Sequence, residues 1–335
     1  MVNEVLVNGR FLARRVTGVE RYGREILSRL ESRARVIQPR RQLRGMRGHA
    51  WEQFVLPSKV SSINILWSPA NTGPLAVRNQ VLTLHDLSPL EHSEWYTDTF
   101  GRWYRFFMPR LAKRVRHVVT PSEYIRQKVI KRFSLPAGKV TVVPGGVDRD
   151  RFHHGLAPLT NLPDRYILSV GSIQPRKHHS ILLQAWIAIQ SNYPDVWLLI
   201  AGTTDPVFRQ GSFPGGIDRL RWLGYVPDAD LPGLYAGAEV FVFPSEEEGF
   251  GLPLLEAMAC GTPAVAARAG ALPEVAGDAV LWFDPADTDA FAENLARCLD
   301  EAELRQDLSR KGLARANAFP WERSAGLLWE VLQKC

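Results

Sequence analysis

Two glutamates, Glu248 and Glu256, stand eight residues apart on either side of a Gly-Phe-Gly turn. The apolar run at residues 240–243 predicts a buried strand before the turn, and residues 254–259 predict a helix after it. The N-terminus of such a helix offers backbone N–H groups and a favourable dipole to an anion. Carboxylates that touched a phosphate would repel it. We therefore expect both glutamates to accept hydrogen bonds from neutral hydroxyls beside the phosphate, as in the two sugars of a nucleotide-sugar.

Two cations, Arg176 and Lys177, follow another predicted strand at residues 166–170. A guanidinium can bind two phosphate oxygens at once, and an ammonium acts as a point charge. Together they could stabilise a leaving diphosphate without a metal ion. The alternative is a solvated basic pair on the surface.

Short apolar runs alternate with helical segments along the chain, which predicts parallel sheets in two successive α/β halves. Strands are expected at residues 4–8, 63–67, 81–84, 117–120, 166–170, 196–201, 220–223, 240–243 and 264–266. Helices are expected at residues 19–30, 181–190, 231–235, 291–299, 304–318 and 321–334. The turn-rich residues 144–148 are expected to open the linker between the halves. Ligands of such sheets bind at the carboxyl ends of the strands, so the chemistry should lie there.

The two glutamates with their turn resemble the Glu-x7-Glu signature of the retaining glycosyltransferases of family GT4, and the resemblance covers nearly the whole chain. It implies the GT-B fold, in which two Rossmann-like domains with parallel sheets face a central cleft. Residues 1–150 would form the N-terminal acceptor-binding domain, and residues 151–318 the nucleotide-sugar-binding domain. Residues 319–335 would form a helix that crosses back to the first domain, since Phe319-Pro-Trp-Glu322 is similar to the family's crossover.

The resemblance also assigns roles around the turn. Glu248 would accept hydrogen bonds from the donor sugar, and Glu256 from the ribose hydroxyls. Arg176 and Lys177 would hold the diphosphate, although His178 stands where the family usually has Asn. Backbone donors are expected from Gly249, Phe250, Gly251, Leu252 and Leu254.

Three further candidates come from similar family segments. His85, in Thr83-Leu-His-Asp-Leu, would contact the donor sugar, although a lone histidine at a strand end is more often structural. Gly18 precedes a predicted helix and would let the backbone approach a phosphate. Tyr225 and Val226 would pack against the nucleotide base. The alternative for each is ordinary packing or a helix start.

Metal and dinucleotide sites are not expected. The pairs Asp148/Asp150, Asp228/Asp230 and Asp287/Asp289 lie in a linker or before helices, where they are typical of turns and caps. The chain has no Gly-x-Gly-x-x-Gly fingerprint. We therefore expect no cofactor, with the nucleotide-sugar as a substrate and no metal dependence. A metal phosphohydrolase would need more ligands near His85.

The charge is unevenly distributed. Residues 1–150 carry 26 Lys and Arg against 12 Asp and Glu, whereas residues 151–335 carry 15 against 23. The three cysteines are far apart, and the first residues resemble neither a signal peptide nor a membrane span. A basic half joined to an acidic half suggests that only the first half meets a polyanion or an anionic surface, and the alternative is a solvated basic face without a partner. The cysteines and the first residues predict a cytoplasmic protein, and no nucleic-acid partner is expected.

A segment from Trp95 to Arg114 interleaves aromatic residues with cations. On a helix it could contact the anionic inner face of the membrane. The alternative, that the rings belong to the core and the cations are solvated, is equally compatible with the sequence.

The sequence therefore predicts a retaining hexosyltransferase of surface polysaccharide (lipopolysaccharide) biosynthesis. Its acceptor would be a saccharide or a lipid-linked saccharide. Wider similarity, in Trp51-Glu-Gln53 and residues 85–95, is to bacterial mannosyl- and rhamnosyltransferases, and GDP-mannose is the first choice of donor. The alternatives are a UDP-, dTDP- or other GDP-sugar, carrying glucose, GlcNAc or rhamnose, and, from another class, a sugar-nucleotide epimerase with the same fold.

Overall fold

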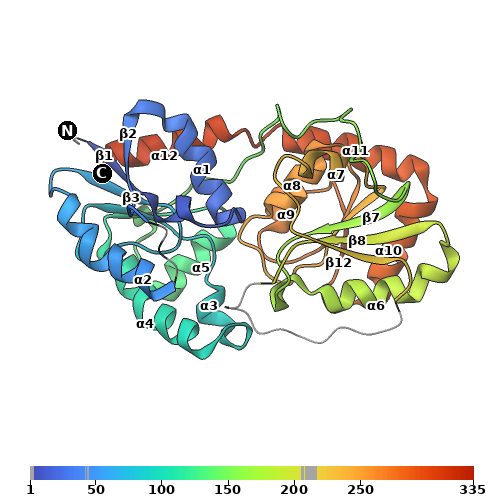
Figure 1. Ribbon diagram of the computed structural model, residues 1–335, viewed down its shortest axis with the longest axis horizontal. Helices are drawn as coiled ribbons and strands as arrows, with labels where there is room; N and C mark the ends of the chain where they lie inside the picture. The colour runs from blue at the N-terminus through green and yellow to red at the C-terminus, as the bar shows by residue number, and fades with distance from the viewer. Residues whose placement is uncertain (1–3, 42, 44, 205–206, 208–216) are drawn as a thin grey trace. The chain divides into compact units, whose positions relative to one another are not determined.

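The computed structural model describes residues 4–41, 43, 45–204, 207 and 217–335 (Figure 1). The chain divides into two compact units. Unit 1 comprises Met1–Glu91, Asp98–Gly146 and Trp321–Cys335, and unit 2 comprises His92–Thr97 and Val147–Pro320.

Unit 1 is built on a six-stranded parallel sheet with the order β2-β1-β3-β4-β5-β6. Its strands are β1 (Val5–Asn8), β2 (Ala34–Ile37), β3 (Ile65–Ser68), β4 (Gln80–Thr83), β5 (His117–Thr120) and β6 (Val140–Val142). Its helices are α1 (Gly18–Leu30), α2 (Gly45–Ala50), α3 (Ser88–Glu91), α4 (Asp98–Arg114), α5 (Glu123–Phe133) and α12 (Trp321–Lys334). α1 packs against α12, and α4 packs against α3 and α5 (Figure 1).

Unit 2 contains a second six-stranded parallel sheet with the order β12-β11-β10-β7-β8-β9. Its strands are β7 (Arg165–Val170), β8 (Val196–Ala201), β9 (Leu220–Gly224), β10 (Val240–Phe243), β11 (Ala264–Ala267) and β12 (Leu281–Phe283). Its helices are α6 (His179–Ile189), α7 (Leu231–Ala236), α8 (Leu252–Ala259), α9 (Leu272–Ala276), α10 (Thr288–Asp300) and α11 (Ala302–Ala316). Helices lie on both sides of the sheet (Figure 1).

Both sheets are parallel, so the predicted α/β class with two parallel sheets is confirmed. The central strands are buried on both faces, which is why each reads as a continuous apolar run. In unit 2, α6 and α10 pack against each other and bury Trp186 and Phe291 in the core. Parallel strands all end at one edge of a sheet, and this edge positions the candidate site residues of each unit.

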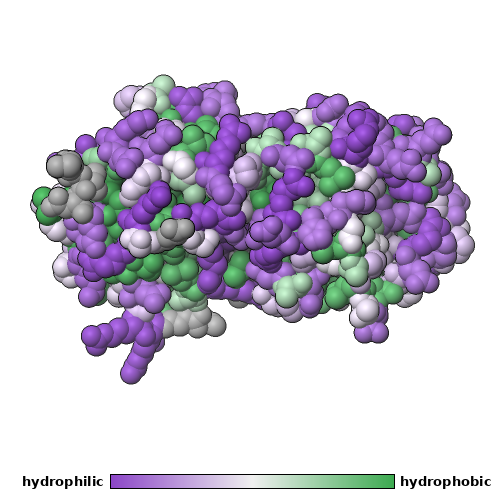
Figure 2. All heavy atoms as spheres, turned by 90° about the horizontal axis from the view of Figure 1, so that it is seen from above, coloured by the Kyte–Doolittle hydropathy of each residue, from purple (hydrophilic) through white to green (hydrophobic). Residues whose placement is uncertain are grey.

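One face of the molecule is mostly polar. Figure 2 shows hydrophilic residues spread over one face, with hydrophobic residues in small areas between them. Within the described ranges, none of the helices combines the length and the hydrophobicity that a membrane span requires.

Candidate active site

Glu248 and the two predicted cations meet in unit 2, at the carboxyl ends of the adjacent strands β7 and β10. The ammonium of Lys177 lies 2.6 Å from Oε1 of Glu248, and Nη1 of Arg176 lies 3.0 Å from Oε2. Lys177 and Glu248 are buried. Both cations are thus bound to the same carboxylate, an arrangement that the sequence did not predict.

Burial and charge shift the pKa values of this cluster. Burial by itself would raise the pKa of Glu248, but Arg176 and Lys177 outweigh it and lower the pKa to about 2. Burial lowers the pKa of Lys177 to about 8, although Glu248 opposes the shift. The carboxylate is therefore charged near neutral pH, and the ammonium loses its proton in mildly alkaline solution.

The loop from β10 to α8 is fixed by its backbone. The backbone N–H of Glu246 donates to the carbonyl of Arg176 at 2.9 Å, and Ala271 donates to the carbonyl of Glu248 at 2.9 Å. Gly270 has a φ of +56°, and a Cβ there would lie 2.5 Å from the carbonyl oxygen of Glu248. Only glycine lets these two backbones approach so closely, so Gly270 determines where Glu248 stands.

The predicted glycine turn leads into α8. Gly251 caps the helix with a φ of +101°, and the helix begins at Leu252, two residues before the predicted start. The N–H of Leu254 is expected to donate a hydrogen bond to a phosphate, but in this structure it donates to the carbonyl of Gly251 at 3.1 Å. The other expected donors, Gly249, Phe250, Gly251 and Leu252, are buried in the same turn and at the start of α8.

Glu256 lies on α8 and is buried. Its Oε2 accepts a hydrogen bond of 3.0 Å from the hydroxyl of Tyr235, a residue of α7 that sequence reasoning missed. The hydroxyl orients one carboxylate oxygen. A buried charge needs a polar partner, so a partner for Glu256 could be expected. Nothing in the sequence indicated that this partner is Tyr235.

Tyr225 and Val226 follow β9, at the edge of the sheet and two strands away from β7. Tyr225 is 47% exposed. His178 has a φ of +49° and follows the 3-10 turn Pro175–Lys177. Asn and His are both enriched in this left-handed conformation, so histidine fits the backbone where the similar family has Asn.

The remaining two candidates, Gly18 and His85, belong to unit 1. Gly18 begins α1, where Glu20 accepts a hydrogen bond from the hydroxyl of Thr17. His85 follows β4 and is buried, with its ring edge-on to that of Tyr22 at 4.9 Å between centroids. The first turns of α1 therefore lie beside His85.

A buried charged cluster in unit 1 was missed from the sequence. Glu52 accepts hydrogen bonds from Asn8 (2.7 Å), Arg10 (2.9 Å) and Thr72 (3.0 Å). Arg10 packs against Gly48, where a Cβ would lie only 2.7 Å from its Nε. In the sequence, Trp51-Glu-Gln53 gives only a family similarity, because nothing in the residue type of Glu52 predicts that its carboxylate is buried. The cluster joins the end of β1, the turn Trp51–Val55 and the segment that follows β3.

The segment from Trp95 to Arg114 divides between core and surface. Trp95, Tyr96, Tyr104 and Phe107 are buried, so most of its rings belong to the core. Phe106 is 54% exposed. The cations on the same helix are exposed: Arg102, Arg105, Arg110, Lys113 and Arg114.

The aspartate pairs behave as turn and cap residues. Oδ1 of Asp287 accepts from the N–H of Ala290 at the start of α10, and Oδ1 of Asp148 accepts from the N–H of Asp150. Asp230 precedes α7 without a side-chain capping bond, so its capping role is not supported. No group of three or more His, Cys, Asp and Glu in the described part of the chain is arranged to hold a metal ion.

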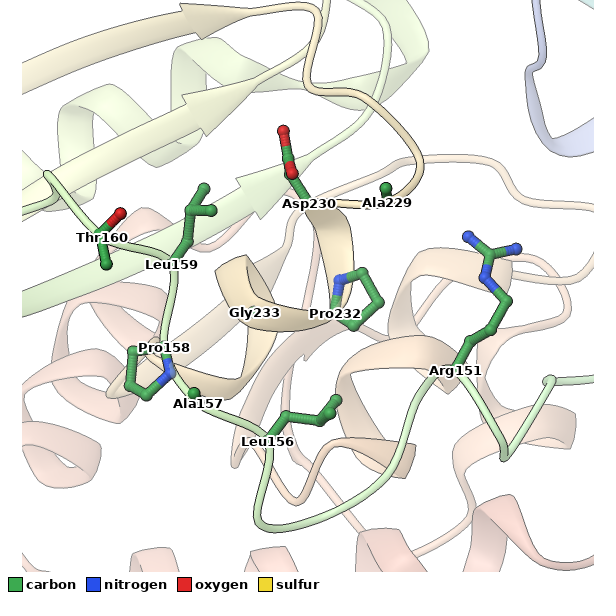
Figure 3. A pocket seen from close by; sticks show the side chains of 10 residues that line it. All are labelled: Arg151, Leu156, Ala157, Pro158, Leu159, Thr160, Ala229, Asp230, Pro232 and Gly233. Atoms are coloured by element: carbon green, nitrogen blue, oxygen red, sulfur yellow. The ribbon is translucent and has the colours of Figure 1, made fainter.

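A cavity of about 570 Å³ lies elsewhere in unit 2, between residues 151–160 and the start of α7 (Figure 3). The backbone of residues 156–160 runs beside α7, and the N–H of Leu159 donates to the carbonyl of Gly233 at 3.1 Å. None of the residues that line this cavity is a candidate site residue.

Two family models match the chain. The model described as "Glycosyl transferases group 1" matches residues 157–315, and "Glycosyltransferase Family 4" matches residues 61–151. O-antigen chain mannosyltransferase B of Escherichia coli is 34% identical over 264 residues, which are 74% of this chain and 68% of that protein. The serotype-specific mannosyltransferase WbdA of Escherichia coli is 30% identical over 270 residues, 75% of this chain but only 33% of that protein.

Solved structures share the fold. Anabaena Alr3699/HepE, in complex with UDP and glucose, has a TM-score of 0.78 and 17% sequence identity, with 99% of this chain and 100% of that chain covered. At this identity the likeness shows the fold alone. It confirms the GT-B fold expected for the two parallel sheets.

Proposed function

Because the chain belongs to glycosyltransferase family 4, and is therefore a glycosyltransferase, we propose that it transfers mannose from GDP-mannose with retention of configuration. The acceptor is a saccharide or lipid-linked saccharide of a surface polysaccharide. The observation that carries the proposal is the cluster of Arg176, Lys177 and Glu248 beside the N-terminus of α8. The relatives' names, O-antigen chain mannosyltransferase B and mannosyltransferase WbdA, support the choice of sugar and product.

Unit 2 binds the donor in this proposal. The diphosphate binds to Arg176 and Lys177 and to the backbone of the turn before α8, where the dipole favours an anion. Glu248 turns from the cations to the sugar hydroxyls, and Glu256 accepts from the ribose. Tyr225 and Val226 pack against the base.

Unit 1 binds the acceptor in this proposal. Gly18 lets the backbone at the start of α1 approach the phosphate, and His85 contacts the donor sugar. The acceptor hydroxyl attacks the anomeric carbon on the face that the diphosphate leaves. The departing phosphate oxygen takes the hydroxyl proton, so the new bond keeps the configuration without a covalent enzyme intermediate.

Charge stabilisation of the leaving diphosphate comes from the two cations. Positioned cations stabilise developing negative charge strongly in a buried site. No metal or other cofactor takes part in the proposed reaction, and excess EDTA should leave the transfer rate unchanged. Loss of activity in EDTA, restored by magnesium or manganese, would refute this part of the proposal.

A thermal-shift screen followed by a product assay tests the function. Binding to the native state raises Tm, and GDP-mannose should raise it more than UDP-, dTDP- or ADP-sugars. With a saccharide acceptor, NMR of the product should show an α-linked mannose. A larger shift with another nucleotide-sugar would replace GDP-mannose as donor. A new free sugar nucleotide formed without acceptor would favour the epimerase.

Membrane contact is the second part of the proposal. Five exposed cations and the exposed ring of Phe106 lie on α4, and residues 102–114 contain no acidic residue. Met46 and Phe54, 57% and 81% exposed, lie in and just after α2. The ring of His49, also on α2, packs against Trp103 of α4 at 5.4 Å. Apolar side chains flanked by cations favour docking on the anionic inner face of the membrane.

A further inference from the structure

One short loop, residues 69–73, holds the ring of His85. Nε2 of His85 lies 2.7 Å from the carbonyl oxygen of Pro69, and its backbone N–H donates to Oδ1 of Asn71 at 2.7 Å. A carbonyl oxygen only accepts hydrogen bonds, so Nε2 carries a proton. Burial lowers the pKa of His85. The ring is therefore neutral near pH 7, and Nδ1 is its acceptor atom.

Asn71 is suited to this place in two respects. Its φ is +60°, a left-handed conformation that few residues other than glycine and asparagine adopt readily. Its N–H donates to the carbonyl of Thr83 at 3.1 Å, which ties the loop to the end of β4. The side chain is then free to turn back and accept from His85. Glycine would allow the backbone but would remove the acceptor.

The far side of the loop is tied to the turn Trp51–Val55, which is π-helical. The hydroxyl of Thr72 donates to Glu52 at 3.0 Å, and Nε2 of Gln53 donates to the carbonyl of Gly73 at 2.9 Å. Glu52 is also bound by Arg10. Consecutive side chains of one turn thus hold two consecutive residues of the loop, so the buried charged cluster supports the loop that holds His85.

We propose that Asn71 is a positioning residue that fixes the orientation and the Nε2–H tautomer of His85, with Glu52 anchoring the loop. The inference rests on the proposed function, because it gives His85 its part in binding the donor sugar. Because Nε2–H is bound to the carbonyl oxygen of Pro69, Nδ1 is the ring atom that accepts a hydrogen bond from a sugar hydroxyl. His85 thus favours a donor sugar that carries a hydroxyl group within hydrogen-bonding distance of Nδ1.

Nitrogen-15 NMR of the imidazole rings tests the positioning directly. The chain has eight histidines, and His85→Gln identifies the signals of His85. The wild type should show the Nε2–H tautomer from pH 7 to 8. In Asn71→Gly the signals should move toward a tautomer average. In Asn71→Asp, which keeps an acceptor oxygen and tolerates the left-handed backbone, they should return toward the wild-type tautomer.

Kinetics provide the second readout. Asn71→Gly should lower kcat/KM roughly three- to tenfold, as expected for one lost hydrogen bond, and Asn71→Asp should recover most of it. Asn161→Gly is the matched control, because Asn161 is also left-handed (φ +64°) but lies exposed in unit 2. It should change neither the His85 signals nor the rate.

Two results would overturn the inference. One is a wild-type His85 with its proton on Nδ1, or signals that Asn71→Gly leaves unchanged. The other is a changed tautomer with unchanged kcat/KM, which would remove His85 from substrate binding. The NMR result does not depend on activity. If no nucleotide-sugar were bound or transferred, the proposed function would fail while the positioning of His85 could still be read.

Discussion

Lys177 and Glu248 are 71 residues apart in the chain, yet Nζ of one lies 2.6 Å from Oε1 of the other in the buried end of unit 2. Arg176 binds the second oxygen of the same carboxylate. Glu248 thus binds the same two cations to which we propose that the diphosphate binds. In the proposed function, a nucleotide displaces this carboxylate from both cations as it binds.

Glu248→Gln should therefore bind GDP more tightly than the wild type, by roughly three- to tenfold, because the amide competes less strongly for the cations. Turnover should fall, since the amide is a weaker acceptor for the sugar hydroxyls. Isothermal titration and steady-state kinetics measure the two effects. Glu246→Gln, at a half-exposed neighbouring carboxylate, is the control. Weaker GDP binding in Glu248→Gln would contradict the proposal that the diphosphate displaces Glu248 from the two cations.

Nucleotide affinity should also depend on pH through Lys177. Its pKa of about 8 means that the ligand-free ammonium becomes neutral above that pH. Diphosphate binding must then take up a proton, and the Kd for GDP should rise by up to about tenfold for each further pH unit. Lys177→Arg should flatten this dependence, because a guanidinium stays charged. An equally steep profile in the arginine variant would assign the effect to another group.

Glu256 should contribute to affinity for the ribose. Glu256→Ala should weaken GDP binding by about 1.5–3 kcal/mol, the range for a hydrogen bond to a charged group. Saturating donor should largely restore turnover. The sharper measurement compares GDP with 2′- and 3′-deoxy-GDP. The wild type should prefer GDP, and Glu256→Ala should lose the preference for one of the hydroxyls. A preference that survives intact would move ribose recognition elsewhere.

Gly270→Ala should displace Glu248. The new Cβ would meet the Glu248 backbone at 2.5 Å, and a left-handed backbone costs an L-residue roughly 1–2 kcal/mol. We expect a loss of stability beyond that strain and a fall in kcat of roughly 10- to 100-fold. Gly155→Ala is the control, since Gly155 has a φ of +87° but no atom within 4 Å of the new Cβ. Equal effects of the two substitutions on thermal unfolding and kcat would exclude a special role for Gly270.

Membrane docking should follow the charge of α4. The double variant of Arg102 and Arg105 to Ser should bind anionic liposomes at least roughly tenfold more weakly, at about 1 kcal/mol per cation near the surface. The matched control changes Lys131 and Arg132, two exposed cations of α5, to Ser. Co-sedimentation should weaken as salt rises. Equal binding to neutral and anionic liposomes, or the same loss in the control, would leave a soluble acceptor as the better proposal.

The central strands were predictable because both of their faces are buried. β5, β8 and β10 have the predicted bounds. The strands that sequence reasoning missed, β2, β6 and β12, all lie at sheet edges, where partial exposure weakens the apolar run.

The sequence likewise predicts some of the candidate site residues and not others. The Glu-x7-Glu turn and the neighbouring cations could be found because their order along the chain matches the order of strand, turn and helix. The roles assigned to them stay predictions. The pairing of Glu248 with Lys177 could not be predicted. These residues are 71 positions apart in the chain, and only the order of the strands in the sheet brings them together. Asn71, Tyr235 and Glu52 act through contacts that leave no local pattern.

The helix α12 has a consequence for the synthesis of the protein. It packs on α1 within unit 1, where the rings of Trp321 and Tyr22 lie edge-on with 5.8 Å between their centroids. Ribosomes make residues 321–334 only after the whole of unit 2. Until then the buried ring of Tyr22 lacks its contact with Trp321. A nascent chain that stalls within unit 2 thus leaves unit 1 unfinished and exposed to chaperones and proteases.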